Sequence, residues 1–336
     1  MGMDKNVVLV NSRTLEQARY YLKTNLGVSE AFYQHCNQFP IHGTGQGSGN
    51  SPTLWCFVCD VLFEAFAAKA HGAVFSSYGR NINISLYMVG FVDDCSQRVN
   101  DFNKTIPPSS TTLMQLMTAD AQLWNDLLWA SGGALEQSKC SFYMIEADWN
   151  ADGHPFLRGG TRTTPIFLQQ NGKMTPTWQK SNYNSHKTLG CYVNPAYSQA
   201  KSWTHLRAKN EGFAQLLEAN VFSRSEAWTF YSAVYLPSML YPLCITPLNR
   251  NQCNILDSRL LRSLIPRCGY NRNMAREIRY APTFMGGAGF RQLYVEQGAL
   301  LIQQVYKWLN TPDSQIGQVL HIAVSWTQLP VSSLQM

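Results

Sequence analysis

The sequence contains few charged residues, because aspartate, glutamate, lysine and arginine together make up 14% of its 336 residues. It contains no run of apolar residues long enough to cross a bilayer, no internal repeat and no low-complexity tract. Residues 1–10 are too short for a secretory signal peptide. Since 45% of the residues are hydrophobic, a disordered chain is also excluded. We therefore expect a globular intracellular protein that does not enter a membrane, in either the nucleus or the cytoplasm.

Cysteine is present, but not in a pattern that builds a disulfide framework. The nine cysteines are an odd number, and only Cys56 and Cys59 lie close together. A zinc site would need a second pair, which the sequence lacks. The segment from Pro52 to Gly72 is apolar over most of its circumference when drawn as a helix, which predicts a central, buried helix. We therefore interpret Cys56 and Cys59 as buried thiols in a reducing compartment.

The sequence also lacks the two common glycine-rich motifs that bind phosphates. Residues 40–52 form a glycine-rich loop before the helix, with Asn50 or Ser51 as its cap and Pro52 in its first turn. A P-loop would have Lys-Ser or Lys-Thr where Asn50 and Ser51 stand. A dinucleotide site would have a strand directly before the loop, and none is predicted there. No dinucleotide or haem cofactor is therefore expected.

The segments before this loop have helical patterns. Apolar residues at Leu15, Ala18 and Leu22 predict a helix that ends at Gly27. A second, short helix is predicted from Ser29 to Tyr33.

Further along, a predicted strand ends on two adjacent carboxylates. Apolar and polar residues alternate over Ile82–Met88, which predicts a half-buried strand. The chain continues through Phe91 to Asp93 and Asp94, and Cys95–Val99 can return as a partner strand, which places both acids at the tip of a hairpin. Two acids this close are costly unless they share a cation, and a hard ion such as Mg²⁺ (or Mn²⁺) suits them. The alternative is an ordinary exposed Asp-Asp turn.

Two motifs, taken together and in this order, resemble the palm of reverse transcriptases. Residues 46–52, Gln-Gly-Ser-Gly-Asn-Ser-Pro, are similar to the family's Gln-Gly-x-x-x-Ser-Pro motif, which packs against the incoming nucleotide and the template. Residues 91–94, Phe-Val-Asp-Asp, are similar to its aromatic-x-Asp-Asp motif, whose acids bind the catalytic metal. The resemblance implies nucleotide- or template-binding roles for Gln46, Gly47, Ser51, Pro52 and Phe91, and metal-binding, catalytic roles for Asp93 and Asp94.

A third motif follows at the expected place. Leucines at helical spacing predict a helix from Thr111 to Ala130, which Gly132 and Gly133 end, and a strand is predicted over Lys139–Ile145. This helix–turn–strand resembles the next palm motif, in which a lysine lies near the phosphates of the nucleotide. The resemblance implies that Lys139 is the general acid for the departing pyrophosphate. A solvated lysine at the start of a strand is the alternative.

Two hairpins are predicted after the palm motifs. Asn171-Gly172 lies between apolar segments, which favours a tight turn. The residues around Leu189-Gly190 resemble the short Leu-Gly hairpin that grips the primer in non-LTR retrotransposon and intron-type enzymes. The resemblance implies that Lys187, Leu189 and Gly190 contact nucleic acid, and an ordinary strand pair at a domain boundary is the alternative.

After Pro195 the pattern is helical and resembles a polymerase thumb. Ser223 and Glu226 form a capping box at the start of one helix. The other helices are predicted over Ser198–Ala219, Asn251–Leu264, Leu300–Leu309 and Gln315–Trp326. The family usually shows a Tyr-Asn-Arg run followed by Gly-Gly-x-Gly, similar to residues 270–272 and 286–289 here.

From Arg259 to Arg279, six arginines are set among Tyr270 and Tyr280. Basic side chains among tyrosines suit a sugar-phosphate backbone with stacked bases, and the net charge of +6 suits a polyanionic partner. A solvated helix face is the alternative for any single one of them. The arginines that we predict to bind nucleic acid are Arg259, Arg262, Arg272 and Arg276.

The expected fold class is therefore α+β. A partial palm, with an antiparallel sheet and packed helices, is expected over residues 1–185, a helical thumb over 186–310, and a C-terminal helix or tail over 311–336. The family also has fingers and a first metal-binding aspartate upstream of the Gln-Gly motif. Only Asp4 precedes Gln46, and no apolar strand carries it. We expect that aspartate and the fingers to be missing, and this chain alone to be inactive.

The resemblance implies a template-directed transfer of deoxynucleotides to a primer 3′-hydroxyl by two-metal catalysis. The implied partners are an RNA template, a DNA primer and deoxynucleoside triphosphates, with no membrane. Three alternatives stay open. They are a nucleic-acid-binding remnant of a retroelement without catalysis, a palm polymerase that copies RNA into RNA, and an unrelated hydrolase with a carboxylate pair, which would need an acid of raised pKa in a cleft.

Overall fold

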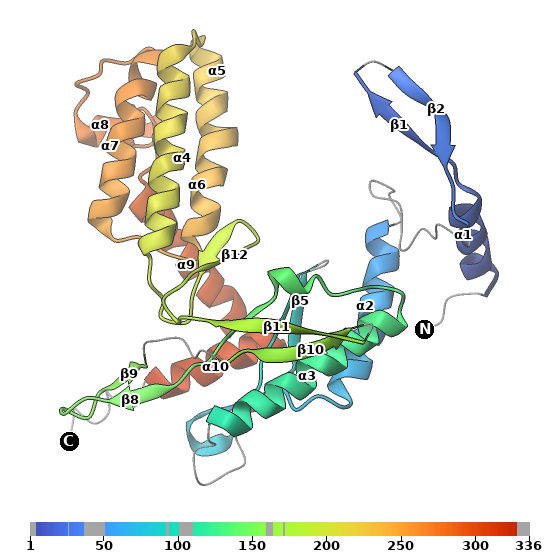
Figure 1. Ribbon diagram of the computed structural model, residues 1–336. Helices are drawn as coiled ribbons and strands as arrows, with labels where there is room; N and C mark the ends of the chain where they lie inside the picture. Colours follow the sequence, from blue (N-terminus) through green and yellow to red (C-terminus); the bar gives the residue numbers. More distant parts are fainter. Residues whose placement is uncertain are drawn as a thin grey trace. The chain divides into compact units, whose positions relative to one another are not determined.

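The computed structural model describes residues 5–25, 27–36, 51–91, 94–100, 110–158, 164–170 and 172–327, which belong to two compact units (Figure 1). The first unit comprises Met1–Ser76, Asn83–Ser141 and Thr163–Trp178, and the second comprises Ser77–Ile82, Phe142–Arg162 and Gln179–Met336. Helices alternate with short antiparallel strand pairs, so the predicted α+β class is confirmed. No helix in these ranges combines the length and the apolar character that crossing a bilayer requires.

The first unit begins with a helix and a hairpin. Helix α1 (Lys5–Gln17) is followed by β1 (Tyr20–Thr24) and β2 (Gly27–Tyr33), which pair in antiparallel register. The predicted second helix from Ser29 is therefore wrong, and so is the continuation of the first helix to Gly27. The rings of Tyr21 and Phe32 lie 5.8 Å apart across the ladder. Cross-strand aromatic contacts of this kind favour a strand pair over helices.

The core of the first unit lies between two helices and a hairpin. Helices α2 (Ser51–Ala67) and α3 (Ser110–Ala130) pack through three buried residues, Leu62, Phe66 and Trp124. The strands β5 (Met88–Phe91) and β6 (Asp94–Gln97) contribute partly buried side chains to the same cluster. The predicted helix over 111–130 is thus confirmed, and it shares a core with Met88 of β5 and Cys95 of β6.

Helix α2 is not buried on all sides, contrary to the prediction. Within the described residues Phe57, Val58 and Val61 are 40%, 42% and 37% exposed, and Cys56 is exposed as well. The interpretation of Cys56 as a core thiol is therefore wrong, whereas Cys59 is half-buried. The reason is that α2 contacts its neighbours along one stripe, centred on Leu62 and Phe66, while its opposite stripe is equally apolar in sequence.

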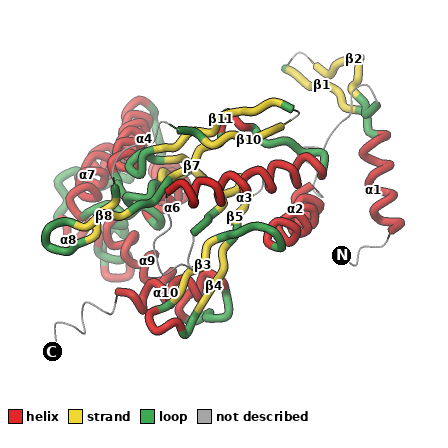
Figure 2. Tube along the Cα trace, turned by 60° about the horizontal axis from the view of Figure 1, so that its bottom comes forward, coloured by secondary structure: helices red, strands yellow, loops and turns green. Residues whose placement is uncertain are grey.

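Two further strand pairs complete the first unit. Strands β3 (Ala73–Ser76) and β4 (Asn83–Leu86) pair with each other, so the strand predicted over Ile82–Met88 ends before Tyr87 and a new pair begins at β5. The Asn171-Gly172 prediction is confirmed, because β10 (Ile166–Gln170) and β11 (Lys173–Lys180) form a hairpin. Figure 2 shows α3 running along this hairpin, where Gln122 and Asn125 donate to the carbonyl oxygen of Gln169, each at 2.9 Å.

The second unit has a helical core. Helices α4 (Ala200–Ala219), α6 (Leu236–Leu243) and α7 (Arg250–Arg267) lie side by side (Figure 1), and α5 (Arg224–Thr229) continues into α6 through a π-helical turn, Phe230–Tyr235. The Ser223–Glu226 capping box is confirmed, with the Ser223 amide donating to Glu226 Oε2 at 2.8 Å. The remaining helices are α8 (Arg276–Tyr280), α9 (Leu293–Leu309) and α10 (Gln315–Thr327), which confirms helices at the last two predicted places.

Short elements surround this core. The strand pairs β8 (Ala147–Trp149) with β9 (Pro155–Leu157) and β12 (His186–Thr188) with β13 (Cys191–Val193) are antiparallel hairpins. The 3₁₀ turns Tyr78–Arg80 and Thr283–Met285 also belong to this unit. The 3₁₀ turn Gln137–Lys139 belongs to the first unit, and β7 (Ser141–Tyr143) begins at the last residue of its segment Asn83–Ser141. The buried side chains of the core come mainly from α4, α5, the π-helical turn, α6, α7 and α9, and include Leu206, Tyr235, Met239, Leu256, Leu260 and Leu293.

Candidate functional site

The two-strand hairpin that the Asp-Asp motif predicts is present. Strands β5 and β6 are antiparallel, and Phe91, the last residue of β5, pairs with Asp94, the first residue of β6. Phe91 is 58% exposed and Asp94 is exposed. Val92 and Asp93 connect the two strands and lie outside the described residues. Asp94 therefore lies within the second strand rather than before it, and Phe91 is the last residue of the first.

Helix α2 packs directly onto this hairpin at a glycine. A Cβ atom built on Gly90 would come within 2.5 Å of Cζ of Phe63 and 3.5 Å of the Cys95 sulfur. Phe63 in turn packs against the core of Leu62, Phe66 and Trp124, with its ring centroid 5.7 Å from that of Trp124. Position 90 therefore has no room for a side chain. The helix that follows the Gln-Gly motif and the hairpin that carries the acids thus share one contact surface.

We expect the replacement Gly90→Ala to destabilise the first unit by about 1–3 kcal/mol, because the new methyl group must displace the packed ring of Phe63. The matched control is Gly212→Ala on α4, where a Cβ meets nothing within 4 Å. That change should be neutral or stabilise the protein by up to about 1 kcal/mol. Hydrogen exchange of peptides from each helix measures both effects, and equal protection of α2 in wild type and Gly90→Ala would contradict the prediction.

The Gln-Gly motif lies mostly outside the described residues. Gln46 and Gly47 are among the residues that the structure does not describe. Pro52 lies in the first turn of α2, as predicted, and Ser51 is the first residue of the helix; only the backbone of these two residues is described. The structure therefore brings together Phe91, Asp94 and α2, and it does not test whether the loop reaches the acids.

Lys139 lies in a 3₁₀ turn rather than at the start of a strand. The turn spans Gln137–Lys139, and the strand that follows begins at Ser141, so the predicted start at Lys139 is wrong. The cause is local, because Gln137 is buried and the amide of Lys139 donates to the carbonyl oxygen of Glu136 at 3.0 Å. Lys139 itself is exposed, so its ammonium group is available to a ligand.

The acids at the hairpin match a hard divalent cation in their chemistry. Mg²⁺ is commonly held by one or two carboxylates together with phosphate oxygens of a substrate. Among the described side chains none pairs with Asp94, so its oxygens face solvent. Within the same ranges no group of three or more His, Cys, Asp or Glu side chains gathers into a metal site. A metal at this hairpin would therefore depend on Asp93, Asp94 and a further ligand.

The Leu-Gly hairpin has an unusual backbone. Strands β12 and β13 are joined by Leu189 and Gly190, whose φ angles are 48° and 81°. Two consecutive positive φ angles define a type I′ turn, which Asn-Gly or Gly-Gly normally forms. A leucine in the left-handed region costs roughly 1–2 kcal/mol. Leu189 is nonetheless 42% exposed, and Lys187 on β12 is exposed as well. The hairpin therefore presents an apolar side chain to solvent at a conformational cost.

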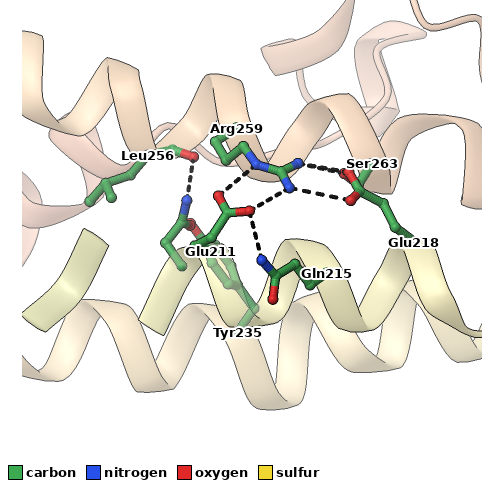
Figure 3. Close-up of polar contacts among 8 residues, drawn as sticks. Glu211, Gln215, Glu218, Tyr235, Leu256, Arg259 and Ser263 are labelled. Atoms are coloured by element: carbon green, nitrogen blue, oxygen red, sulfur yellow. Dashed lines mark hydrogen bonds and ion pairs between the residues drawn. The ribbon is translucent and has the colours of Figure 1, made fainter. Parts of the chain in front are cut away.

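The four predicted arginines differ in what they contact. Arg259 is already engaged by two acids of α4, since its Nε and Nη2 atoms each lie 2.8 Å from a Glu211 oxygen and its Nη1 lies 2.8 Å from Glu218 Oε1 (Figure 3). Hydrogen bonds from Arg259, and then from Ser263, lower the pKa of Glu218 to about 2. The other three, Arg262, Arg272 and Arg276, are exposed. Arg259 therefore joins α7 to α4, and the exposed three remain candidates for phosphate contacts.

We expect Arg259→Gln to lower the thermal midpoint of the second unit, because it leaves Glu211 and Glu218 without their shared cation. It should leave the salt dependence of nucleic-acid binding unchanged. Arg262→Gln should leave the thermal midpoint unchanged. On a duplex it should reduce the slope of log K against log salt by about 0.9. Thermal unfolding and fluorescence anisotropy on a template–primer duplex separate the two. An equal loss of slope in both variants would contradict this assignment.

Several polar residues that the sequence analysis did not select are central to the structure. Asp120 on α3 is 2% exposed, lies 2.7 Å from Nδ1 of His71, and accepts from the amide of Gly72 at 3.2 Å, which fixes the turn into β3. Asp257 has a raised pKa, but it is buried in the helical core, whereas the hydrolase alternative needs such an acid in a cleft. Its side chain is 4% exposed within the helical core, where burial raises its pKa to about 7. No periodic pattern distinguishes these residues, because their partners are distant in sequence.

The comparisons with known proteins leave the family open. The chain matches no protein-family model and no curated protein. A functional assignment therefore has to come from the motifs and from the geometry of the described residues.

Proposed function

We propose that this chain is a palm and thumb portion of a reverse transcriptase of the non-LTR retrotransposon type. The observation that carries the proposal is the contact at Gly90, where the helix that follows the Gln-Gly motif packs against the hairpin that bears Phe91 and Asp94. Residues 53–90 separate the two motifs along the chain, and this contact joins the helix after the first motif to the hairpin of the second. The type I′ hairpin at Leu189-Gly190 adds the primer-gripping element that the resemblance implies.

In this proposal each residue has a limited task. Asp93 and Asp94 would hold Mg²⁺ (or Mn²⁺), which, when bound, neutralises charge that develops on the reacting phosphate. Phe91, exposed at the end of β5, packs against the nucleotide, and exposed Lys139 donates a proton to the departing pyrophosphate. Leu189 and Gly190 contact the primer. Arg262, Arg272 and Arg276 bind backbone phosphates, and Arg259 holds α4 and α7 together instead.

Primer extension on an RNA template tests the proposal. We expect the 336-residue chain alone to incorporate no labelled dTTP on poly(rA)–oligo(dT), because Asp4 is the sole aspartate before Gln46. A longer product to which a segment with a metal-binding aspartate and fingers has been joined should incorporate dTTP with Mg²⁺. Asp93→Asn should reduce that rate by about 10³-fold or more, since it removes a metal ligand from the reacting centre.

The matched control is Asp60→Asn, which removes one exposed carboxylate from α2 and should leave the rate unchanged. A folded longer product without any incorporation, or one insensitive to Asp93→Asn, would overturn the polymerase proposal. Robust Mg²⁺-dependent incorporation by the 336-residue chain would refute only its expected inactivity.

Two alternatives give different results in the same assays. A non-catalytic nucleic-acid-binding remnant would bind template–primer with a salt-dependent affinity, and Asp93→Asn would change nothing. A polymerase that copies RNA into RNA would incorporate ribonucleotides in preference to deoxynucleotides. The exposed arginines Arg262, Arg272 and Arg276 are compatible with either of them.

A further inference from the structure

A surface of the second unit combines an exposed tyrosine with several cations. It is formed by the β12–β13 hairpin, the turn after it and the first half of α4, residues 186–209. The hydroxyl of Ser202 on α4 donates to the carbonyl oxygen of Tyr192 at 3.1 Å, which ties the helix to the hairpin, and Figure 1 shows β12 beside the end of α4. We call it the 186–209 surface.

Tyr197 is held outward on this surface in an unfavourable conformation. Its side chain is 92% exposed and its φ angle is 53°, in the left-handed region that a tyrosine rarely adopts. Exposing a whole aromatic ring and accepting this φ both cost free energy, so the conformation persists only if its surroundings enforce it. Strained, exposed residues of this kind are concentrated at binding sites.

The enforcing residue is Asn194. Its Oδ1 accepts from the amide of Ser198 at 2.9 Å, and its Nδ2 donates to the carbonyl oxygen of Ser198 at 2.8 Å and to the hydroxyl of Ser185 at 3.1 Å. The amide of Tyr197 donates to the carbonyl oxygen of Asn194 at 3.1 Å. Asn194 is 9% exposed, so these bonds are shielded from water. These hydrogen bonds fix the backbone of the turn, and the Tyr197 side chain is therefore held in its exposed position.

Cations gather beside this turn without acids among them. From His186 to Asn210 the chain contains Lys187, Lys201, Arg207 and Lys209 and no aspartate or glutamate. Lys201 lies over the ring of Tyr192, with 5.9 Å from Nζ to the centroid, and the same ring lies 5.2 Å from that of His205. Burial lowers the pKa of His205, and the positive charges of Lys187, Lys209 and Lys201 lower it further. All three lysines therefore lie near the His205 side chain. The nearest acid along α4, Glu211, is paired with Arg259.

We propose that the 186–209 surface binds single-stranded nucleic acid, with Tyr197 stacking on a base and Lys187 and Lys201 contacting the adjacent phosphates. A flat ring presented beside a row of cations is the arrangement that binds single strands without sequence preference. A protein partner rich in aspartate and glutamate would pair with the lysines, but it would not need an aromatic ring whose flat faces are exposed. The inference takes its class of ligand, nucleic acid, from the proposed function. It adds to that function a residue that stacks on a base.

Binding of a fluorescein-labelled dT₁₅ strand with one 2-aminopurine, measured on the full chain by anisotropy, tests the inference. Tyr197→Asn removes the ring and suits a positive φ, so it should keep the unit folded while weakening binding about 5- to 100-fold. Tyr197→Phe should keep near-normal affinity, and the quenching of 2-aminopurine should be lost only in Tyr197→Asn. Lys201→Gln should instead reduce the slope of log K against log salt by about 0.7.

The control is Tyr306→Gln, which removes a 72% exposed ring from α9 and should leave the affinity unchanged. Equal affinities of wild type and Tyr197→Asn would overturn the inference, and so would binding to anionic phosphatidylserine vesicles in place of the strand. The result is separable from the polymerase test. Strand binding that depends on Tyr197, together with no primer extension by the longer product, would sink the catalytic proposal alone. Primer extension by the longer product, together with Tyr197-independent binding, would sink this inference alone.

Discussion

Replacement of Gly287 by alanine is expected to destabilise the second unit by about 3 kcal/mol or more. A Cβ atom built on Gly287 would overlap the carbonyl oxygen of Ala281 and lie 2.5 Å from its Cβ. Both obstacles belong to backbone or to a Cβ, so no side-chain rotation can remove them. The chain after Gly287 would have to move away from Ala281.

That movement would disturb a backbone ladder and the core behind it. The amide of Ala288 donates to the carbonyl oxygen of Ile278 at 2.8 Å, and the amide of Phe290 donates to the carbonyl oxygen of Arg279 at 3.1 Å. Ala288 and Phe290 are each 2% exposed, and the Phe290 ring stacks on that of Trp228 at 4.8 Å. Shifting the segment therefore breaks hydrogen bonds and removes apolar area from the core at once.

Gly298→Ala on α9 is the matched control, because a Cβ at that position meets nothing within 4 Å. It should stabilise the helix by roughly 0.5–1 kcal/mol, since alanine has the higher helix propensity. Urea unfolding, followed by hydrogen exchange of peptides from α7 and α9, measures both variants. A loss below about 1 kcal/mol in Gly287→Ala would show that the segment can relax, against the prediction.

The stability of the second unit is expected to fall by up to about 4 kcal/mol as pH rises from about 4 to about 8, because of Asp257. Burial raises the pKa of this carboxyl from its usual 3.8 to about 7, against the opposing effects of the Leu293 amide and of Arg276. The folded state therefore holds a proton that the unfolded state has released. The stabilising contribution is fully present below pH 4 and is lost as pH rises through 7.

The variant Asp257→Asn should remove this slope. Its amide oxygen can still accept the hydrogen bond from the Leu293 amide, which is 3.1 Å from Asp257 Oδ2, and it cannot ionise. The variant should match wild type near pH 4 and exceed it at pH 8. Burial lowers the pKa of His205 below its usual 6.5, so His205 adds a slope of opposite sign on the acid side of that value. This slope cancels in the difference between variant and wild type.

Asp313→Asn serves as control, because it removes a carboxylate from an exposed turn of the same unit. Its stability curve should run parallel to that of wild type between pH 5 and 8. Unfolding free energies at several pH values, from hydrogen exchange of α7 and α9, give the comparison. Parallel curves for Asp257→Asn and wild type would mean that the buried carboxyl stays ionised in the folded state.

Much of the local structure could be predicted from neighbouring residues. β10 and β11 pair as a hairpin, as Asn171-Gly172 predicts, Ser223 and Glu226 cap α5, and the leucine spacing over 111–130 predicts α3. Each of these depends on residues within a turn or two of one another. The prediction failed at Ser29–Tyr33, where a helical pattern gives way to a strand that pairs with β1.

The candidate site was less predictable. The hairpin that carries Phe91 and Asp94 followed from the alternation before it, whereas the need for glycine at position 90 comes from Phe63, far away in the chain. Arg259 has the same sequence context as the other arginines, yet two acids of α4 bind it. The exposure of Tyr197 depends on Asn194 and Ser185, and no motif marks it.

By itself, the sequence determined the α+β class, the places of most helices, both tight hairpins and the motifs on which the polymerase proposal depends. These follow from periodicity, capping and turn chemistry, which act between residues close along the chain. Only the tertiary structure decided that one arginine is paired and three are exposed, that one face of α2 is open, and that Asp257 is buried. Charge pairing and burial depend on distances through space, and residues far apart in the chain set those distances.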